Sequence, residues 1–295
     1  MSLHKPTVFK GVATALLTPF RDGAIDYPAL RTLIEMQIRA GVDALLIAGT
    51  TGEGSTISFS EFEELVGHAK DFVQDRVPLL AGCGSNCTER ACELSRIACR
   101  AGADALLAVT PYYNKTSSQG ILLHYQAIAS ASTRPVLIYN VPSRTGFHMT
   151  LKHYEALARE ERIVGVKEAS GDLALLEALV SGYGDYYDVY TGNDDQILPA
   201  MKLGARGVIS VCSNVAPQKT AELCRLCASG DYKKAAQRAG KLRPLITELF
   251  REVNPIPVKY LASLLGLCAA EYRLPLCPPS AETRQRLEAI LTEVL

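Results

Sequence analysis

Short, continuous apolar runs alternate along this chain with longer stretches in which apolar residues recur at helical spacing. Apolar runs of this length, without polar alternation, are typical of parallel strands that are buried on both faces. They lie at residues 11–17, 43–48, 78–82, 104–109, 135–140, 163–167, 187–191 and 206–211. The stretches between them, such as 27–40 and 60–72, are amphipathic. The pattern therefore predicts strands and helices in alternation, with the strands in a parallel sheet.

The sequence pattern that joins a helix to the following strand is repeated along the chain. Residues 39–50 read RAGVDALLIAGT, residues 100–110 read RAGADALLAVT, and residues 203–210 read LGARGVIS, a looser echo. Each copy combines a helix end, a glycine suited to the C-cap and a buried strand. Eight alternating units favour an α/β fold of the (β/α)8 TIM-barrel type over an open doubly wound sheet. The first strand is not followed by the GxGxxG motif of a dinucleotide-binding fold.

After residue 215 the pattern is helical to the end of the chain. Residues 1–215 are therefore predicted to form the (β/α)8 barrel core. Residues 216–295 are predicted to form the last barrel helix and a C-terminal helical extension that packs onto the barrel. No linker or low-complexity segment separates the two parts.

Composition and charge exclude several kinds of partner. The 295 residues are 48% hydrophobic, and 31 basic residues balance 31 acidic ones, so no nucleic acid partner is expected. No apolar stretch reaches the roughly 18 residues that span a bilayer, so no membrane partner and no signal peptide are expected. The nine cysteines are scattered through apolar patterns, which indicates buried thiols in a reducing, cytoplasmic compartment. Cys224 and Cys227 form a CxxC pair in a helical pattern, without a second pair for zinc.

Lys167, which closes the apolar run 163–167, is the most informative single residue. A lysine at the end of a buried strand either extends its ammonium to solvent or has a chemical role. In an apolar pocket the ammonium is destabilised, so the lysine pKa falls and the neutral amine that forms a Schiff base becomes populated. On this residue alone, both interpretations stay open.

Other polar groups follow the ends of the predicted strands, where barrels of this type carry their chemistry. The loop Gly49–Gly54 is either a plain glycine-rich turn or a nest of amides and hydroxyls for an anion. Tyr113 and Tyr139 suit either the core or proton transfer, and Arg144 is either a solvated charge or a ligand contact. Together with Lys167, these groups favour a site that forms an imine, moves protons and holds a small carboxylate.

Hydrolytic and metal-centred chemistry is not favoured by the sequence, because no histidine lies at a predicted strand end. The histidines are His4, His68, His124, His148 and His153. Asp194 and Asp195 lack clustered oxygen partners, so they are expected to cap a helix rather than to ligate a metal. No metal site is predicted.

At these strand ends the chain resembles the pyruvate-dependent class I aldolases of the N-acetylneuraminate lyase superfamily, and among them the dihydrodipicolinate synthases. The resemblance runs nearly end to end. The motifs that carry it are GTTGE at 49–53, PYYN at 111–114, YNVPSRTG at 139–146, GVKEAS at 165–170, NPIPVK at 254–259 and RLPL at 273–276. Arg144 in its YNVPSRTG setting, together with paired Thr50 and Thr51, favours the synthases over the sialic-acid and sugar-acid lyases.

The resemblance implies an enzyme that condenses pyruvate with aspartate 4-semialdehyde to 4-hydroxy-tetrahydrodipicolinate, in lysine (diaminopimelate) biosynthesis. Lys167 would form an imine with pyruvate, and loss of a methyl proton would give an enamine that attacks the aldehyde. Transimination and ring closure would then release the product. The imine would supply the electron sink, so no separate cofactor is expected.

The resemblance also implies roles for individual residues. Tyr139 would be the main proton donor and acceptor, linked through Thr50 to Tyr113. Thr51 and loop amides would hold the pyruvate carboxylate, and Arg144 would hold the carboxylate of the second substrate. Two further positions, Gly192 and Ile209, would line the pyruvate pocket. The family's usual homotetramer, a dimer of dimers, would place Tyr113 in a neighbouring subunit's site.

One departure concerns feedback inhibition. The lysine-sensitive members use a glutamate and a histidine at positions that fall here on Arg90 and Phe62, whereas Asn86 and Tyr112 are retained. A cation at position 90 would repel the ammonium of the inhibitor. The resemblance therefore predicts weak or absent inhibition by lysine.

Two alternatives remain. The first is a related aldolase that acts on a 2-keto-3-deoxy sugar acid, a sialic acid or 4-hydroxy-2-oxoglutarate through the same imine. The second is a barrel without catalytic activity that binds a metabolite as a regulator. Retention of Lys167, Tyr139 and Thr50 together argues against the second.

Overall fold

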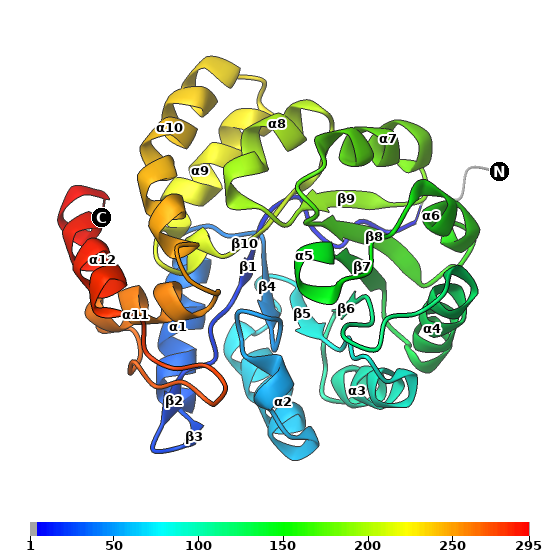
Figure 1. Cartoon of the computed structure of the whole chain (residues 1–295), viewed down its shortest axis with the longest axis horizontal. Helices are drawn as coiled ribbons and strands as arrows, with labels where there is room; N and C mark the ends of the chain where they lie inside the picture. Colours follow the sequence, from blue (N-terminus) through cyan, green and yellow to red (C-terminus); the bar gives the residue numbers. More distant parts are fainter. Residues whose placement is uncertain (1–4, 295) are drawn as a thin grey trace.

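The computed structural model describes residues 5–294 and contains a closed barrel of parallel strands in the order β1-β10-β9-β8-β7-β6-β5-β4 (Figure 1). The barrel strands are β1 (Gly11–Ala15), β4 (Ala44–Ile47), β5 (Leu79–Gly82), β6 (Ala105–Val109), β7 (Val136–Asn140), β8 (Ile163–Glu168), β9 (Asp188–Thr191) and β10 (Gly207–Ser210). Each of the eight predicted runs contains one of these strands. The predicted TIM-barrel fold is confirmed.

Helices follow the strands and form the outer layer of the barrel (Figure 1). They are α1 (Tyr27–Arg39), α2 (Phe59–Val73), α3 (Thr88–Arg100), α4 (Ser118–Ala131), α6 (Leu151–Leu157), α7 (Leu173–Tyr183), α8 (Ile197–Lys202) and α9 (Pro217–Ala228). Local sequence sets their starts. Asp26 accepts a hydrogen bond from the Ala29 amide at the start of α1, and Ser58 and Glu61 form a capping box at the start of α2.

The strands are buried on both faces, as their continuous apolar sequences predict. Side chains such as Ala13, Leu80 and Leu137 fill the inside of the barrel, whereas their sequence neighbours pack under the helices. Phe9, which precedes β1, stacks on Tyr190 of β9 with ring centroids 4.2 Å apart. The Tyr190 hydroxyl donates to the Phe9 carbonyl oxygen. This pair extends the core inside the barrel to the residues that precede β1.

Three helices continue the chain beyond α9: α10 (Tyr232–Leu249), α11 (Ile256–Leu264) and α12 (Ala281–Val294). Figure 1 shows them gathered on one side of the barrel, beside α1 and α9. Helix α10 packs along α9 and also contacts α8. The turn between α10 and α11 returns to the carboxyl ends of the strands, where it contacts the loop that follows β4.

Some elements differ from the sequence interpretation. The chain also forms a two-stranded hairpin, β2 (Phe20–Arg21) and β3 (Ala24–Ile25), and a one-turn helix, α5 (Pro142–Thr145). All nine cysteines are free thiols, but Cys87 and Cys277 are exposed, so only part of the set is buried as expected. Cys224 and Cys227 are both buried in α9, and burial raises the pKa of each thiol. None of the helices within residues 5–294 has the length and apolarity to cross a membrane.

Candidate active site

Lys167 lies at the carboxyl end of β8 and is only 5% exposed. Its Nζ atom is 4.3 Å from the centroid of the Tyr139 ring, and the two residues are paired in register across β7 and β8. Because Gly192 has no side chain, it leaves space for the side chain of Lys167. An ideal Cβ at position 192 would lie 2.8 Å from Lys167 Cε and 2.6 Å from Ala169 Cβ. The lysine side chain is therefore enclosed in the barrel mouth instead of extending into solvent.

A cavity of about 530 Å³ opens beside Tyr139, whose ring contacts Lys167, although Lys167 itself does not line it. Three of the predicted site residues line it: Thr50 from the loop after β4, Tyr139 from β7 and Arg144 from α5. The Arg144 guanidinium donates through Nη2 to the Asn254 carbonyl oxygen at 3.1 Å. The cavity thus brings an exposed cation close to the buried lysine and tyrosine.

Thr51, Gly192 and Ile209 do not line this cavity. Thr51 is buried beside Thr50, and Ile209 is buried inside the barrel on β10. Tyr113 does not line the cavity of its own chain either, and its side chain is 91% exposed. Its φ of +67° lies in the left-handed region, which is uncommon for a non-glycine residue. Within one chain, Tyr113 therefore does not border the cavity that Thr50, Tyr139 and Arg144 line.

The loop Gly49–Gly54 folds tightly over the ends of β4 and β5. The Gly54 amide donates to the Gly49 carbonyl oxygen, and an ideal Cβ at position 54 would lie 2.0 Å from the Ala48 carbonyl oxygen. Glycine is required there because any side chain would overlap the backbone. Glu53 adopts a φ of +53°, in the left-handed region, and its carboxylate is fully buried.

Residues of the C-terminal extension bind the Glu53 side chain of this loop. The Glu53 carboxylate accepts from Lys259 Nζ at 2.5 Å, and both side chains are fully buried. The second Glu53 oxygen accepts from the Arg273 amide. The Lys259 ammonium also lies 4.2 Å from the Phe20 ring centroid. Burial lowers the pKa of Lys259, and the Glu53 charge opposes that shift.

Asp194 does not cap a helix, so that expectation is wrong. The residue begins a short 3₁₀ turn, but its buried carboxylate accepts from the Ser210 hydroxyl at 2.5 Å and from the amides of Val211 and Cys212. Ser210 ends β10 and the two amides follow it, so three donors from the end of this strand satisfy the carboxylate. Burial raises the pKa of Asp194, whereas the hydrogen bonds and the positive charge of Lys167 lower it. Asp195 is exposed.

Metal-ligating side chains do not gather in the described part of the chain. No group of three or more histidines, cysteines or acidic residues within it could hold a metal ion. Of the five histidines, His4 lies outside the described residues. His124 and His153 are buried within the helix layer, where burial lowers their pKa.

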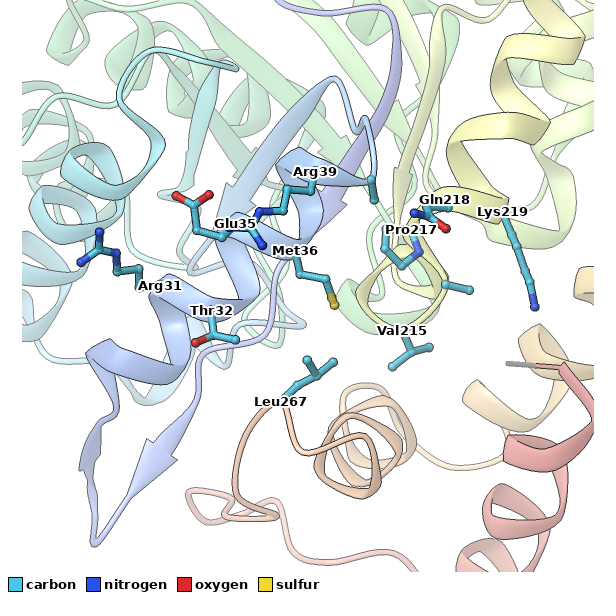
Figure 2. Close-up of a pocket in the computed structure, with 12 residues that line it drawn as sticks. Arg31, Thr32, Glu35, Met36, Arg39, Val215, Pro217, Gln218, Lys219 and Leu267 are labelled. Carbon is cyan, nitrogen blue, oxygen red and sulfur yellow. The ribbon is translucent and has the colours of Figure 1, made fainter.

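A second cleft, of about 780 Å³, lies outside the barrel mouth (Figure 2). Helix α1 forms one wall and the start of α9 forms the other, with Met36, Val215 and Leu267 at its apolar centre. It contains none of the predicted site residues. The smaller cavity, which Thr50, Tyr139 and Arg144 line, is therefore the candidate active site.

Comparison with known proteins agrees with this choice. The chain matches the model of the dihydrodipicolinate synthetase family over residues 8–294. It belongs to that family. The resemblance seen in the sequence motifs is thereby confirmed.

The dihydrodipicolinate synthetase relatives match along nearly their whole length. The 4-hydroxy-tetrahydrodipicolinate synthase of Geobacter metallireducens is 44% identical over 286 residues, which cover 97% of this chain and 99% of the relative. The enzyme of the same name from Thermoanaerobacter sp. is 42% identical, with 97% of each chain covered. The crystal structure of dihydrodipicolinate synthase from Thermotoga maritima superposes with a TM-score of 0.95 at 39% identity and covers 98% of this chain and 99% of that one.

The dihydrodipicolinate synthetase motif NPIPVK carries two groups that the sequence analysis left without a role. Lys259 closes the motif inside an otherwise apolar helix, α11. This is the same signal that drew attention to Lys167, and it could have identified a second buried lysine. Asn254 opens the motif and contacts both Thr51 and Arg144. No sequence signal indicates those two partners.

Proposed function

We propose that this protein is a 4-hydroxy-tetrahydrodipicolinate synthase, which condenses pyruvate with aspartate 4-semialdehyde in lysine (diaminopimelate) biosynthesis. The observation that carries the proposal is Lys167, buried at the end of β8 against the Tyr139 ring. The names of the full-length relatives support the same reaction. The nine free thiols are consistent with a cytoplasmic enzyme.

The reaction begins at Lys167. Its neutral amine attacks the ketone carbon of pyruvate, water leaves, and an imine forms. The pyruvate carboxylate rests on Thr51 and on amides of the Gly49–Gly54 loop. Gly192 and Ile209 shape the pocket around the methyl group. The protonated imine accepts the electron pair released at the next step, so we propose that the enzyme needs no separate cofactor.

The carbon–carbon bond forms from the enamine. Loss of a pyruvate methyl proton gives this enamine, which attacks the aldehyde carbon of the second substrate, and the aldehyde oxygen takes up a proton. The amine of that substrate then attacks the imine carbon, closes the ring and releases Lys167. Tyr139 donates and accepts the protons, and Thr50 links it to Tyr113.

Tyr113 completes the proton relay from a neighbouring subunit in our proposal. Its 91% exposure and its position outside the cavity of its own chain support a role that reaches across an interface. We therefore propose a homotetramer built as a dimer of dimers. Small-molecule substrates and copies of this chain are the only partners proposed.

A coupled assay tests the function. The purified protein is supplied with pyruvate and aspartate 4-semialdehyde, and in parallel with pyruvate and a series of sugar aldehydes. We expect turnover of pyruvate with aspartate 4-semialdehyde and no turnover of pyruvate with the sugar aldehydes. Preferential turnover with a sugar aldehyde would instead assign the protein to the sugar-acid aldolases.

Arg144→Ala is expected to affect the second substrate more than pyruvate. A charge-assisted contact with a carboxylate contributes about 1.5–3 kcal/mol, so its loss predicts a decrease of about 10- to 150-fold in kcat/KM for the semialdehyde. Formation of the pyruvate imine, followed by borohydride trapping, is expected to continue. A variant that no longer traps pyruvate would place Arg144 in the first substrate's half of the site.

L-Lysine at millimolar concentration is expected to inhibit this enzyme weakly or not at all. Arg90 and Phe62 line the cavity together with Asn86 and Tyr112, so the two substituted positions border the same cavity. The Arg90 guanidinium is 4.7 Å from the Phe59 ring centroid and would repel the ammonium of lysine. A dose–response curve measures the effect. Inhibition below 1 mM would show that another anion, such as Glu89, replaces the missing partner.

A further inference from the structure

Asn254 lies outside the barrel, in the turn between α10 and α11, yet it reaches the carboxyl ends of the strands. The residue is 6% exposed and lines the same cavity as Tyr139 and Arg144. It is separated by 203 positions from Thr51 and by 110 positions from Arg144, and it contacts both. In the proposed site, Thr51 holds the carboxylate of pyruvate and Arg144 holds the carboxylate of the second substrate.

The side chain of Asn254 forms a hydrogen bond with Thr51. Its Nδ2 atom donates to Thr51 Oγ1 at 3.0 Å, and its Oδ1 atom has no hydrogen-bond partner within residues 5–294. A threonine hydroxyl carries one hydrogen and two lone pairs. Because the amide occupies a lone pair, the hydroxyl hydrogen stays free to bind an acceptor. A carboxylate in the cavity is such an acceptor.

The main chain of Asn254 forms a hydrogen bond with Arg144. Its carbonyl oxygen accepts from Arg144 Nη2 at 3.1 Å. A guanidinium has five N–H groups in a rigid fork, so one bond to a carbonyl orients the plane and leaves other donors for a ligand. The side chain and the main chain of one residue therefore contact different halves of the site.

We propose that Asn254 is a positioning residue that acts separately on the two substrates: its side chain orients Thr51 for the pyruvate carboxylate, and its carbonyl orients Arg144 for the carboxylate of the aldehyde. This inference rests on the proposed function and extends it to a residue of the C-terminal extension. It predicts that a change confined to the side chain affects only the first substrate.

Asn254→Ala removes the side-chain bond and keeps the carbonyl. Loss of one hydrogen bond of ordinary strength corresponds to an increase of about fivefold in the KM for pyruvate. The KM for the semialdehyde is expected to stay within about twofold, since the carbonyl contact with Arg144 remains. Asn254→Asp is expected to raise the KM for pyruvate further, because a carboxylate accepts the Thr51 hydrogen and repels the substrate anion.

A double-mutant cycle separates positioning from general structural support. In a Thr51→Ala background, Asn254→Ala is expected to cause no further rise in the KM for pyruvate. The matched control is Glu252→Gln, in the same turn, because Glu252 bonds to Ser280 and Thr283 and does not line the cavity. This control is expected to leave both KM values unchanged. Thermal unfolding of each variant confirms that it is folded.

Equal changes in both KM values, an unchanged KM for pyruvate in Asn254→Ala, or full additivity with Thr51→Ala would overturn the inference. Half-saturation by pyruvate is also measured by borohydride trapping, which needs no aldehyde. If the wild-type protein traps pyruvate but condenses it with a different aldehyde, the proposed function is wrong, and the trapping data still decide the role of Asn254.

Discussion

Lys167→Arg is expected to lose nearly all turnover and to leave no pyruvate adduct after borohydride reduction. A guanidinium stays protonated in proteins, so it cannot attack a ketone, although it keeps the positive charge and most of the length of lysine. In the wild-type protein, pyruvate with borohydride is expected to leave a covalent adduct on Lys167 alone. Intact-mass measurement detects the adduct, and peptide mapping locates it.

The matched control for this variant is Lys234→Arg, because that side chain is 70% exposed and pairs only with Asp231 next to it. Its turnover and adduct are expected to equal those of the wild type. The other buried lysine, Lys259, is the informative alternative site. An adduct mapped to Lys259, or no adduct at all, would exclude the imine mechanism at Lys167.

Lys259→Met is expected to lower the free energy of unfolding by about 3–5 kcal/mol. The substitution keeps the apolar length of the side chain but leaves the Glu53 carboxylate fully buried without its cationic partner. An uncompensated buried charge is far more costly than the loss of an exposed ion pair. Urea-induced unfolding at constant protein concentration measures the difference.

The double variant Glu53→Gln/Lys259→Met provides the matched comparison. It removes the buried charge along with its partner, so it is expected to recover a large part of the stability lost in the single variant. A Lys259→Met protein within about 1 kcal/mol of the wild type would show that Glu53 takes up a proton or finds another cation.

The barrel was predictable because its signal is local. Each strand is a short apolar run, and residues such as Gly41 and Gly102, with φ of +79° and +100°, mark the helix ends that precede two of them. The same locality explains why Lys167 and Tyr139 were recognised as strand-end residues. A side chain at the carboxyl end of a barrel strand must reach the mouth, whatever the loops do.

The contacts between distant residues that hold the site in place could not be predicted in this way. Asn254 meets Thr51 and Lys259 meets Glu53 across more than 200 positions, and no periodicity encodes which loop a distant turn contacts. The hydrogen bonds of Asp194 come from three donors at the end of β10, which the closed barrel brings to it. The hairpin β2–β3 has two residues in each strand, too few to show alternation.

The exposure of Arg144 has a kinetic consequence under the proposed function. Arg144 is exposed and lines the cavity together with Tyr139, whose ring contacts the buried Lys167. An aldehyde held by Arg144, as we propose, would lie on the solvent side of Lys167 and would obstruct a ketone on its way in. We therefore expect pyruvate to bind first and an excess of the aldehyde to slow turnover.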